Sequence, residues 1–164
     1  DPVSVGDKDG ISAAAMFTEM VCNLKNQGKS VWQLIDELAI KFGLFVSDQI
    51  SVRVTDLGVI PIVMNNLRIN TPKKFGQLEV SNVSDLTKPE SGLPPTDGII
   101  FYLTGTDGIS RGRVIIRPSG TEPKIKCYLE VVADSKDLIA GRELAQKAIA
   151  EIGFDVQPLL TGGN

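Results

Sequence analysis

Apolar residues near the N-terminus recur at steps of three and four, a spacing that predicts two consecutive amphipathic helices. The first is expected over residues 9–27, with Asp9 as its N-cap and Gly28 as its end. The second begins at Ser30, because Ser30 and Gln33 have the spacing of a capping box. A short turn joins the helices, so we expect them to pack antiparallel. Two helices cannot bury both apolar stripes alone, which indicates a further packing partner.

Farther along the chain, the helical spacing gives way to short alternating stretches that are typical of strands. Strands are predicted at residues 49–55, 77–83, 98–103, 113–116 and 124–132, and helices at 59–67 and 135–152. Consecutive strands favour an α+β fold with an antiparallel sheet whose helices cover one face. A linker and hinge are expected within residues 43–50, so the predicted domains are residues 1–45 and 46–164. Residues 158–164 resemble a loose tail.

The composition excludes several kinds of site. The 164 residues include no histidine, which removes Ser–His and Cys–His catalysis and most zinc sites. The net charge of −3 argues against a general nucleic-acid-binding protein. No apolar run approaches the ~18 residues of a membrane span, and residues 1–9 lack the features of a signal peptide. Cys22 and Cys127 fit two buried free thiols, so we expect a cytoplasmic protein.

One segment, RPSGTEPK at residues 117–124, has the composition of an anion-binding loop between two predicted strands. Its guanidinium can donate two parallel N–H bonds to a phosphate, its hydroxyls add donors, and its glycine permits a turn that directs backbone N–H groups into one concavity. Residues 111–126 also form a basic stretch in an acidic chain. The candidate phosphate-binding residues are Arg117, Ser119, Gly120, Thr121, Lys124 and Lys126. Composition alone equally allows a hairpin turn with solvated charges.

The run RPSGTEPKIKCYLE at residues 117–130 resembles the phosphate-binding loop of the α-D-phosphohexomutases, the family of phosphoglucomutase and phosphomannomutase. The resemblance implies a TATA-box-binding-protein-like fourth domain that holds the non-transferring substrate phosphate. Glu122 is then expected to point away from the phosphate or to orient Arg117. The segment Asp7–Lys8–Asp9–Gly10 is similar to the family's third domain, which makes Lys8 a candidate catalytic residue. The alternative for Lys8 is an exposed lysine before a helix.

The resemblance also implies what the intact enzyme does. It would move a phosphoryl group between the 1- and 6-positions of glucose or mannose phosphate, with Mg²⁺ and a phosphoserine supplied by earlier domains that are missing here. We therefore expect no metal site in this chain, partnership with those missing domains, no nucleic-acid or membrane partner, and no mutase activity from the chain alone. Two alternatives remain: a stand-alone module that binds sugar phosphates or anions, and an interaction domain whose exposed helices pair with a partner.

Overall fold

The computed structural model describes residue 6 and residues 9–88, 94–106, 108–134 and 136–161. It divides into two compact units, Asp1–Phe42 and Gly43–Asn164, which we describe separately. How these units correspond to the domains of a longer protein stays a prediction.

The first unit contains two helices whose predicted ends are present. They are α1 (Gly10–Asn26) and α2 (Val31–Phe42). The Asp9 carboxylate accepts the N–H groups of Ile11 at 3.1 Å and Ser12 at 2.9 Å. These bonds, that of Ser12 above all, lower the pKa of Asp9. The capping box is confirmed, because Ser30 N–H donates to Gln33 Oε1 at 2.7 Å and Gln33 N–H donates to Ser30 Oγ at 3.2 Å.

The turn between α1 and α2 is a Schellman motif. Gly28 has a φ of +70°, in the left-handed region that glycine adopts without strain. Its N–H donates to Lys25 O at 3.0 Å, and Lys29 N–H donates to Leu24 O at 2.9 Å. Gly28 therefore ends the first helix, as the sequence predicted.

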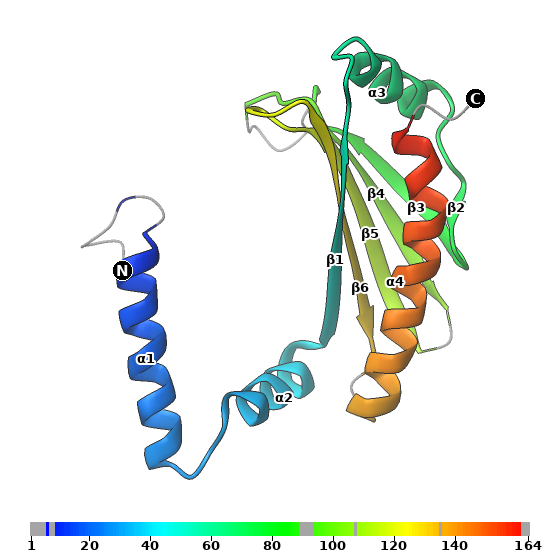
Figure 1. The fold of residues 1–164 in the computed structure, drawn as a ribbon. Helices are drawn as coiled ribbons and strands as arrows, with labels where there is room; N and C mark the ends of the chain where they lie inside the picture. The colour runs from blue at the N-terminus through cyan, green and yellow to red at the C-terminus, as the bar shows by residue number, and fades with distance from the viewer. Residues whose placement is uncertain (1–5, 7–8, 89–93, 107, 135, 162–164) are drawn as a thin grey trace. The chain divides into compact units, whose positions relative to one another are not determined.

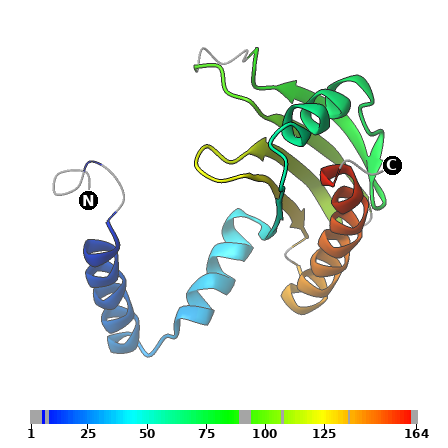
Figure 2. The same ribbon diagram turned by 45° about the horizontal axis from the view of Figure 1, so that its top comes forward.

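Most apolar side chains of the first unit stay exposed. Of the described residues in these helices, only Leu24 and Ala39 are buried. The exposed large apolar residues are Ile11, Met16, Phe17, Trp32, Ile35, Leu38, Ile40 and Phe42. The expected antiparallel packing is not seen, since α1 and α2 diverge from their turn (Figures 1 and 2). Cys22 is exposed for the same reason and not buried as expected.

The second unit is built on a six-stranded antiparallel sheet with the strand order β1–β6–β5–β4–β3–β2. The strands are β1 (Leu44–Arg53), β2 (Lys74–Phe75), β3 (Leu78–Asp85), β4 (Ile99–Thr106), β5 (Ile109–Pro118) and β6 (Lys124–Ala133). The helices are α3 (Val59–Ile69) and α4 (Leu138–Leu160). Figure 1 shows α4 running along one face of the sheet. The predicted α+β fold with an antiparallel sheet is confirmed.

Alternation along the strands separates a covered face of the sheet from an open face. In β6 the residues Ile125, Cys127, Leu129 and Val131 are buried, on the face that α4 contacts. The intervening residues Lys124, Lys126, Tyr128 and Glu130 are half-buried and point to the other face. Burial raises the pKa of the Cys127 thiol to about 12, so this thiol stays protonated. The polar and charged side chains of β6 thus lie on the open face of the sheet.

The linker expected near residues 43–50 is a strand instead. Residues 44–53 pair with residues 124–133 along their whole length, and Leu44 is buried. Hydrogen bonds to β6 thus include residues 44–48, which were expected to act as a hinge. Of that expected hinge, only Gly43, with a φ of +109°, lies outside the sheet. The sequence was misleading here because the apolar residues 44–46 follow α2 without polar residues to mark a new strand.

The expected tail is wrong for residues 158–160, because α4 continues to Leu160, and residues 162–164 lie outside the described residues. Ile152, Val156 and Leu160 are fully buried at helical spacing. The Asp155 carboxylate accepts the N–H of Gly76 at 2.7 Å, which anchors this part of the helix to the segment after β2. Pro158 lies in the last turn of α4 and cannot donate a backbone hydrogen bond. The burial of Val156 and Leu160 on either side of it offsets that loss. No helix in the described part of the chain is both long and apolar enough to cross a membrane.

Candidate anion-binding site

The loop between β5 and β6, residues 119–123, lies at one end of the open face of the sheet. Main-chain bonds fix both of its ends. Ser119 N–H donates to Lys124 O at 2.8 Å, and Val54 N–H, just after β1, donates to Pro123 O at 2.9 Å. The loop is therefore a tight connection between strands, as the sequence predicted.

The middle of the loop leaves donors unused. The N–H groups of Gly120 and Thr121 have no acceptor among the described residues, and both residues are exposed. A Cβ on Gly120 would meet no atom within 4 Å, so a ligand could approach its backbone closely. The φ of Gly120 is not positive, and Ser119 N–H is used inside the loop. The expected concavity of successive N–H groups is thus reduced to the middle of the loop.

Arg117 is exposed and contacts a residue that the sequence analysis missed, Tyr128. Its Nη2 donates to Tyr128 Oη at 3.3 Å, and its Cζ lies 5.7 Å from the centre of the tyrosine ring. The hydrogen bond from Arg117 lowers the pKa of Tyr128. The alternation of β6 could have identified this residue, because it places Tyr128 on the same face as Lys124 and Lys126.

Of the two alternatives expected for Glu122, orienting Arg117 is not seen; that it points away from a phosphate stays a prediction. Its carboxylate pairs with Lys124, and its Oε1 lies 3.5 Å from Nη2 of Arg53 in β1. The hydrogen bond from Lys124, followed by the charge of that lysine, lowers the pKa of Glu122. Glu122 is therefore ionised at neutral pH. Arg53 is the second residue that sequence reasoning missed, and it reaches the loop because β1 pairs with β6.

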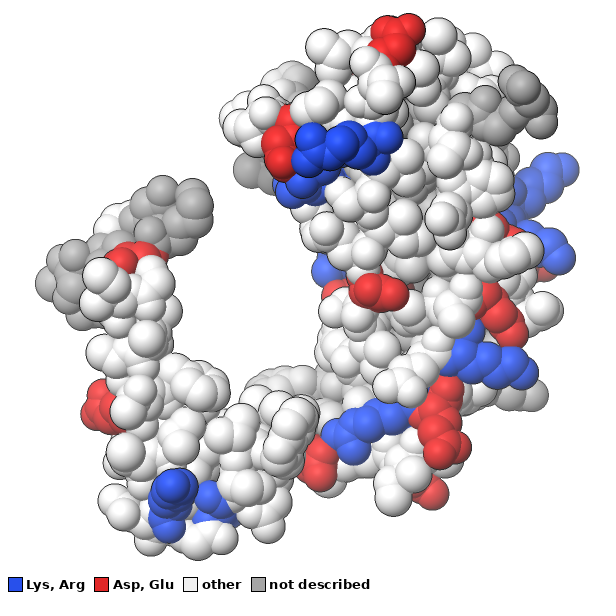
Figure 3. Space-filling model, viewed as in Figure 1, with Lys and Arg blue, Asp and Glu red and all other residues white. Residues whose placement is uncertain are grey.

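Three cationic side chains, Lys124, Arg53 and Lys126, thus act on the Glu122 carboxylate at this end of the sheet. Arg117, which pairs with Lys126 on the neighbouring strand, adds a fourth positive charge there. Figure 3 shows lysine and arginine atoms beside acidic atoms at this end of the second unit. The rest of the predicted basic stretch is used elsewhere: Arg113 Nε is 2.8 Å from Glu130 Oε1, and Arg111 lies over the Phe45 ring at 5.6 Å. Arg113 is therefore neutralised, whereas Arg111 keeps its charge at the other end of β5, away from the loop.

The segment before β4 supports the other side of Arg117. Gly98 lies beside Arg117, since a Cβ added to Gly98 would reach within 3.5 Å of the Arg117 Cβ. Arg68 of α3 fixes this region, with Nε 3.0 Å from Asp85 Oδ2 and Nη2 2.6 Å from Asp97 Oδ1. Arg117 thus pairs with Lys126 of β6 on one side and lies next to the segment that Arg68 bonds to on the other.

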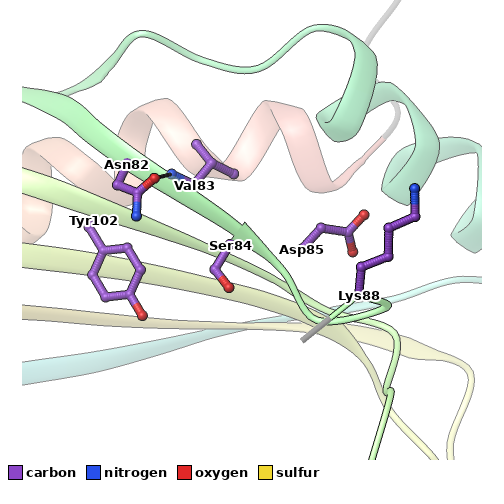
Figure 4. Close-up of a pocket in the computed structure, with 6 residues that line it drawn as sticks. All are labelled: Asn82, Val83, Ser84, Asp85, Lys88 and Tyr102. Atoms are coloured by element: carbon purple, nitrogen blue, oxygen red, sulfur yellow. Dashed lines mark hydrogen bonds between the residues drawn. The ribbon is translucent and has the colours of Figure 1, made fainter. Parts of the chain in front are cut away.

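Two open pockets lie along the sheet. The first, about 540 Å³, is lined by Tyr128 together with Gln49, Arg113 and Glu130, so it adjoins Arg117. The second, about 310 Å³, is lined by Asn82, Val83, Ser84, Asp85, Lys88 and Tyr102 (Figure 4). Neither pocket is lined by a predicted site residue, and Asp85 in the second is already bonded to Arg68. The first pocket is linked to the candidate site through Tyr128, the hydrogen-bond partner of Arg117.

Lys8, the candidate catalytic residue, lies outside the described residues. Within the described part of the chain, no three His, Cys, Asp or Glu side chains are grouped so that they could hold a metal ion. The described site offers cations, hydroxyls and backbone donors to an anion.

Replacing Glu122 with glutamine is expected to tighten the binding of inorganic phosphate by this chain about two- to fivefold at low salt. The substitution removes an ionised group that repels phosphate and frees Lys124 and Arg53 from their ion pairs. The expected effect is modest because charges exposed to water interact weakly. Isothermal titration would measure the change, with Glu143→Gln on α4 as the matched control. Weaker binding by Glu122→Gln would show that the carboxylate is needed to order the cations.

Comparison with known proteins identifies the family of this chain. Residues 109–145, which include β5, the loop and β6, match the family described as phosphoglucomutase/phosphomannomutase, C-terminal domain. The chain is 45% identical over 161 residues to a probable phosphomannomutase of Haemophilus influenzae, covering 98% of this chain and 30% of that protein. It is 32% identical over 139 residues to a phosphopentomutase of Mus musculus, covering 77% of this chain and 22% of that protein.

A phosphoglucomutase of Staphylococcus epidermidis is 27% identical over 156 residues, covering 83% of this chain and 26% of that protein. The chain spans less than a third of the length of these relatives. From the matched family region and the similarity along nearly the whole chain, we conclude that the chain belongs to the phosphoglucomutase/phosphomannomutase family and corresponds to the C-terminal part of its members.

Proposed function

We propose that this chain is the part of a phosphohexomutase that binds the substrate phosphate that is not transferred. The main support is the loop at residues 119–123, which is fixed at both ends. Beside the exposed Arg117, the N–H groups of Gly120 and Thr121 bond to none of the residues that the structure describes. A rigid loop loses little entropy when an anion binds, so such an arrangement favours a phosphate. The site is also rich in positive charge.

In this proposal each group at the loop has a separate role. Arg117 donates two parallel N–H bonds to the phosphate oxygens, and the hydroxyls of Ser119 and Thr121 add hydrogen bonds. Lys124 and Lys126 attract the anion over a longer range, with Lys124 partly neutralised by Glu122. The loop recognises the phosphate and not the sugar, so it can accept a substrate in two orientations. One relative is a phosphopentomutase, which supports phosphate binding that does not depend on the size of the sugar.

The proposed substrate is glucose or mannose phosphate, isomerised between its 1- and 6-phosphates. The names of relatives, a probable phosphomannomutase and a phosphoglucomutase, support this class. The phosphoserine, the Mg²⁺ that offsets charge during transfer, and the choice of sugar are assigned to earlier domains of the whole protein. Lys8 is proposed to take part in orienting substrate or in proton transfer. A cytoplasmic location is supported by the two free cysteines.

The purified chain alone is expected to show no mutase turnover, because it supplies positioning and not the phosphoryl donor. The assay would follow conversion of glucose 1-phosphate and mannose 1-phosphate, with Mg²⁺ and the sugar 1,6-bisphosphate, by the chain and by the full-length protein in parallel. The proposal expects activity from the full-length protein only. Turnover by the chain, or an inactive full-length protein that still binds sugar phosphate, would contradict it; the second result would favour an anion-binding module.

A second candidate function, docking to another protein, is favoured by the eight exposed apolar side chains of α1 and α2. In the mutase proposal, earlier domains of the same protein cover these faces. Static light scattering on the chain and on the full-length protein distinguishes the two. Association of the chain alone fits faces that are covered in the whole protein, whereas association of the full-length protein through α1 and α2 would support docking.

A further inference from the structure

We infer that Tyr128 is a positioning residue for Arg117, which holds the guanidinium ready for the phosphate before the ligand arrives. The inference rests on the proposed function and adds a residue to that site. Arg117 in β5 pairs with Lys126, and Tyr128 pairs with Ile115, so Arg117 and Tyr128 are diagonal neighbours on the open face. At such positions long side chains can reach each other across the strands.

The contact between these two side chains is double. The guanidinium carbon of Arg117 lies 5.7 Å from the centre of the Tyr128 ring, and Nη2 donates to the Tyr128 hydroxyl at 3.3 Å. The ring restricts where the guanidinium can lie, and the hydroxyl fixes its rotation. Because a guanidinium has five N–H donors, one bond to tyrosine leaves enough donors for a bidentate contact with phosphate.

The partner of Arg117, Tyr128, is an uncharged side chain and not a carboxylate. The other arginine near Tyr128 on this face, Arg113, is bonded to Glu130 at 2.8 Å and 3.1 Å and is therefore neutralised. Glu122, the carboxylate within the loop, pairs with Lys124 and Arg53 instead. Tyr128 thus orders Arg117 without cancelling its charge, so the full charge remains for the anion. Ordering before binding lowers the entropy that binding costs.

The test is a double-mutant cycle that measures binding of inorganic phosphate by the whole chain. Tyr128→Phe keeps the ring and loses the hydroxyl, and a single hydrogen bond predicts about two- to tenfold weaker binding. Tyr128→Ala loses both contacts and is expected to weaken binding further. In an Arg117→Ala background, both substitutions should have no additional effect, because there is no guanidinium left to position.

Tyr102→Ala is the matched control, since Tyr102 is a tyrosine on β4 that lines the other pocket. It should leave phosphate binding unchanged. The inference is overturned if Tyr128→Phe binds phosphate like the parent, or if the Tyr128 substitutions weaken binding equally with and without Arg117. Should Tyr128→Ala fail to fold, Tyr128→Phe and its cycle decide alone. If Arg117→Ala itself has no effect, the proposed function fails, and not only the role of Tyr128.

Discussion

Replacing Arg117 with alanine is expected to weaken the binding of inorganic phosphate by this chain about 10- to 150-fold. A charge-assisted contact to a phosphate contributes about 1.5–3 kcal/mol, and each 1.4 kcal/mol corresponds to a tenfold change in affinity. The fold should be unaffected, because the Arg117 side chain is exposed on the open face and its partner is the Tyr128 side chain. Isothermal titration of the variant with phosphate at fixed ionic strength would measure the loss.

Arg111→Ala provides the control for this experiment. Arg111 lies on the same strand, six residues from Arg117 or roughly 20 Å along β5, and contacts Phe45. Both substitutions remove one positive charge, so they change the net charge of the chain equally. A large effect for Arg117 alone indicates a specific contact. Equal, small effects from both would mean that phosphate is attracted by general charge and that no site exists at the loop.

Replacing Leu160 with alanine is expected to lower the free energy of unfolding by about 2–5 kcal/mol, toward the lower value because the end of a helix can relax. Leu160 has no exposed surface, although it lies in the last turn of α4 after Pro158. Removing its side chain would leave a cavity under the helix. Urea denaturation of the chain, followed by circular dichroism, would measure the change.

Phe154→Ala serves as the comparison, since it removes a larger apolar side chain from the same helix. Phe154 is 81% exposed, so its loss is expected to change the free energy of unfolding by less than ~0.5 kcal/mol. If Leu160→Ala is as harmless as Phe154→Ala, then the last turn of α4 does not pack on the unit, and the loose tail that the sequence predicted would be correct.

Local sequence signals identified much of this fold. The alternation in residues 124–132 predicted β6, and the caps at Asp9 and Ser30 placed two helix starts correctly, because each depends on a few neighbouring residues. The same local reasoning stopped the last helix too early. Pro158 and the glycines after it resemble a terminus, and only the buried positions of Val156 and Leu160 show that packing continues the helix.

The composition of the loop could be predicted from the sequence, but its surroundings could not. Arg53 and Glu122 are 69 positions apart, and they meet only because the first strand of the unit pairs with the last. No local pattern encodes that pairing. The sequence also could not assign partners to the charges, so it counted Arg111 and Arg113 with the loop although both are engaged elsewhere.

The central claim, that a phosphate binds at residues 117–124, is tested most directly by nuclear magnetic resonance of the ¹⁵N-labelled chain titrated with inorganic phosphate. The account predicts saturable shifts that are largest at the N–H groups of Gly120 and Thr121 and at the side chain of Arg117, with chloride as the reference salt. Shifts that rise without saturation, spread over the surface lysines, or match those seen with chloride would contradict it.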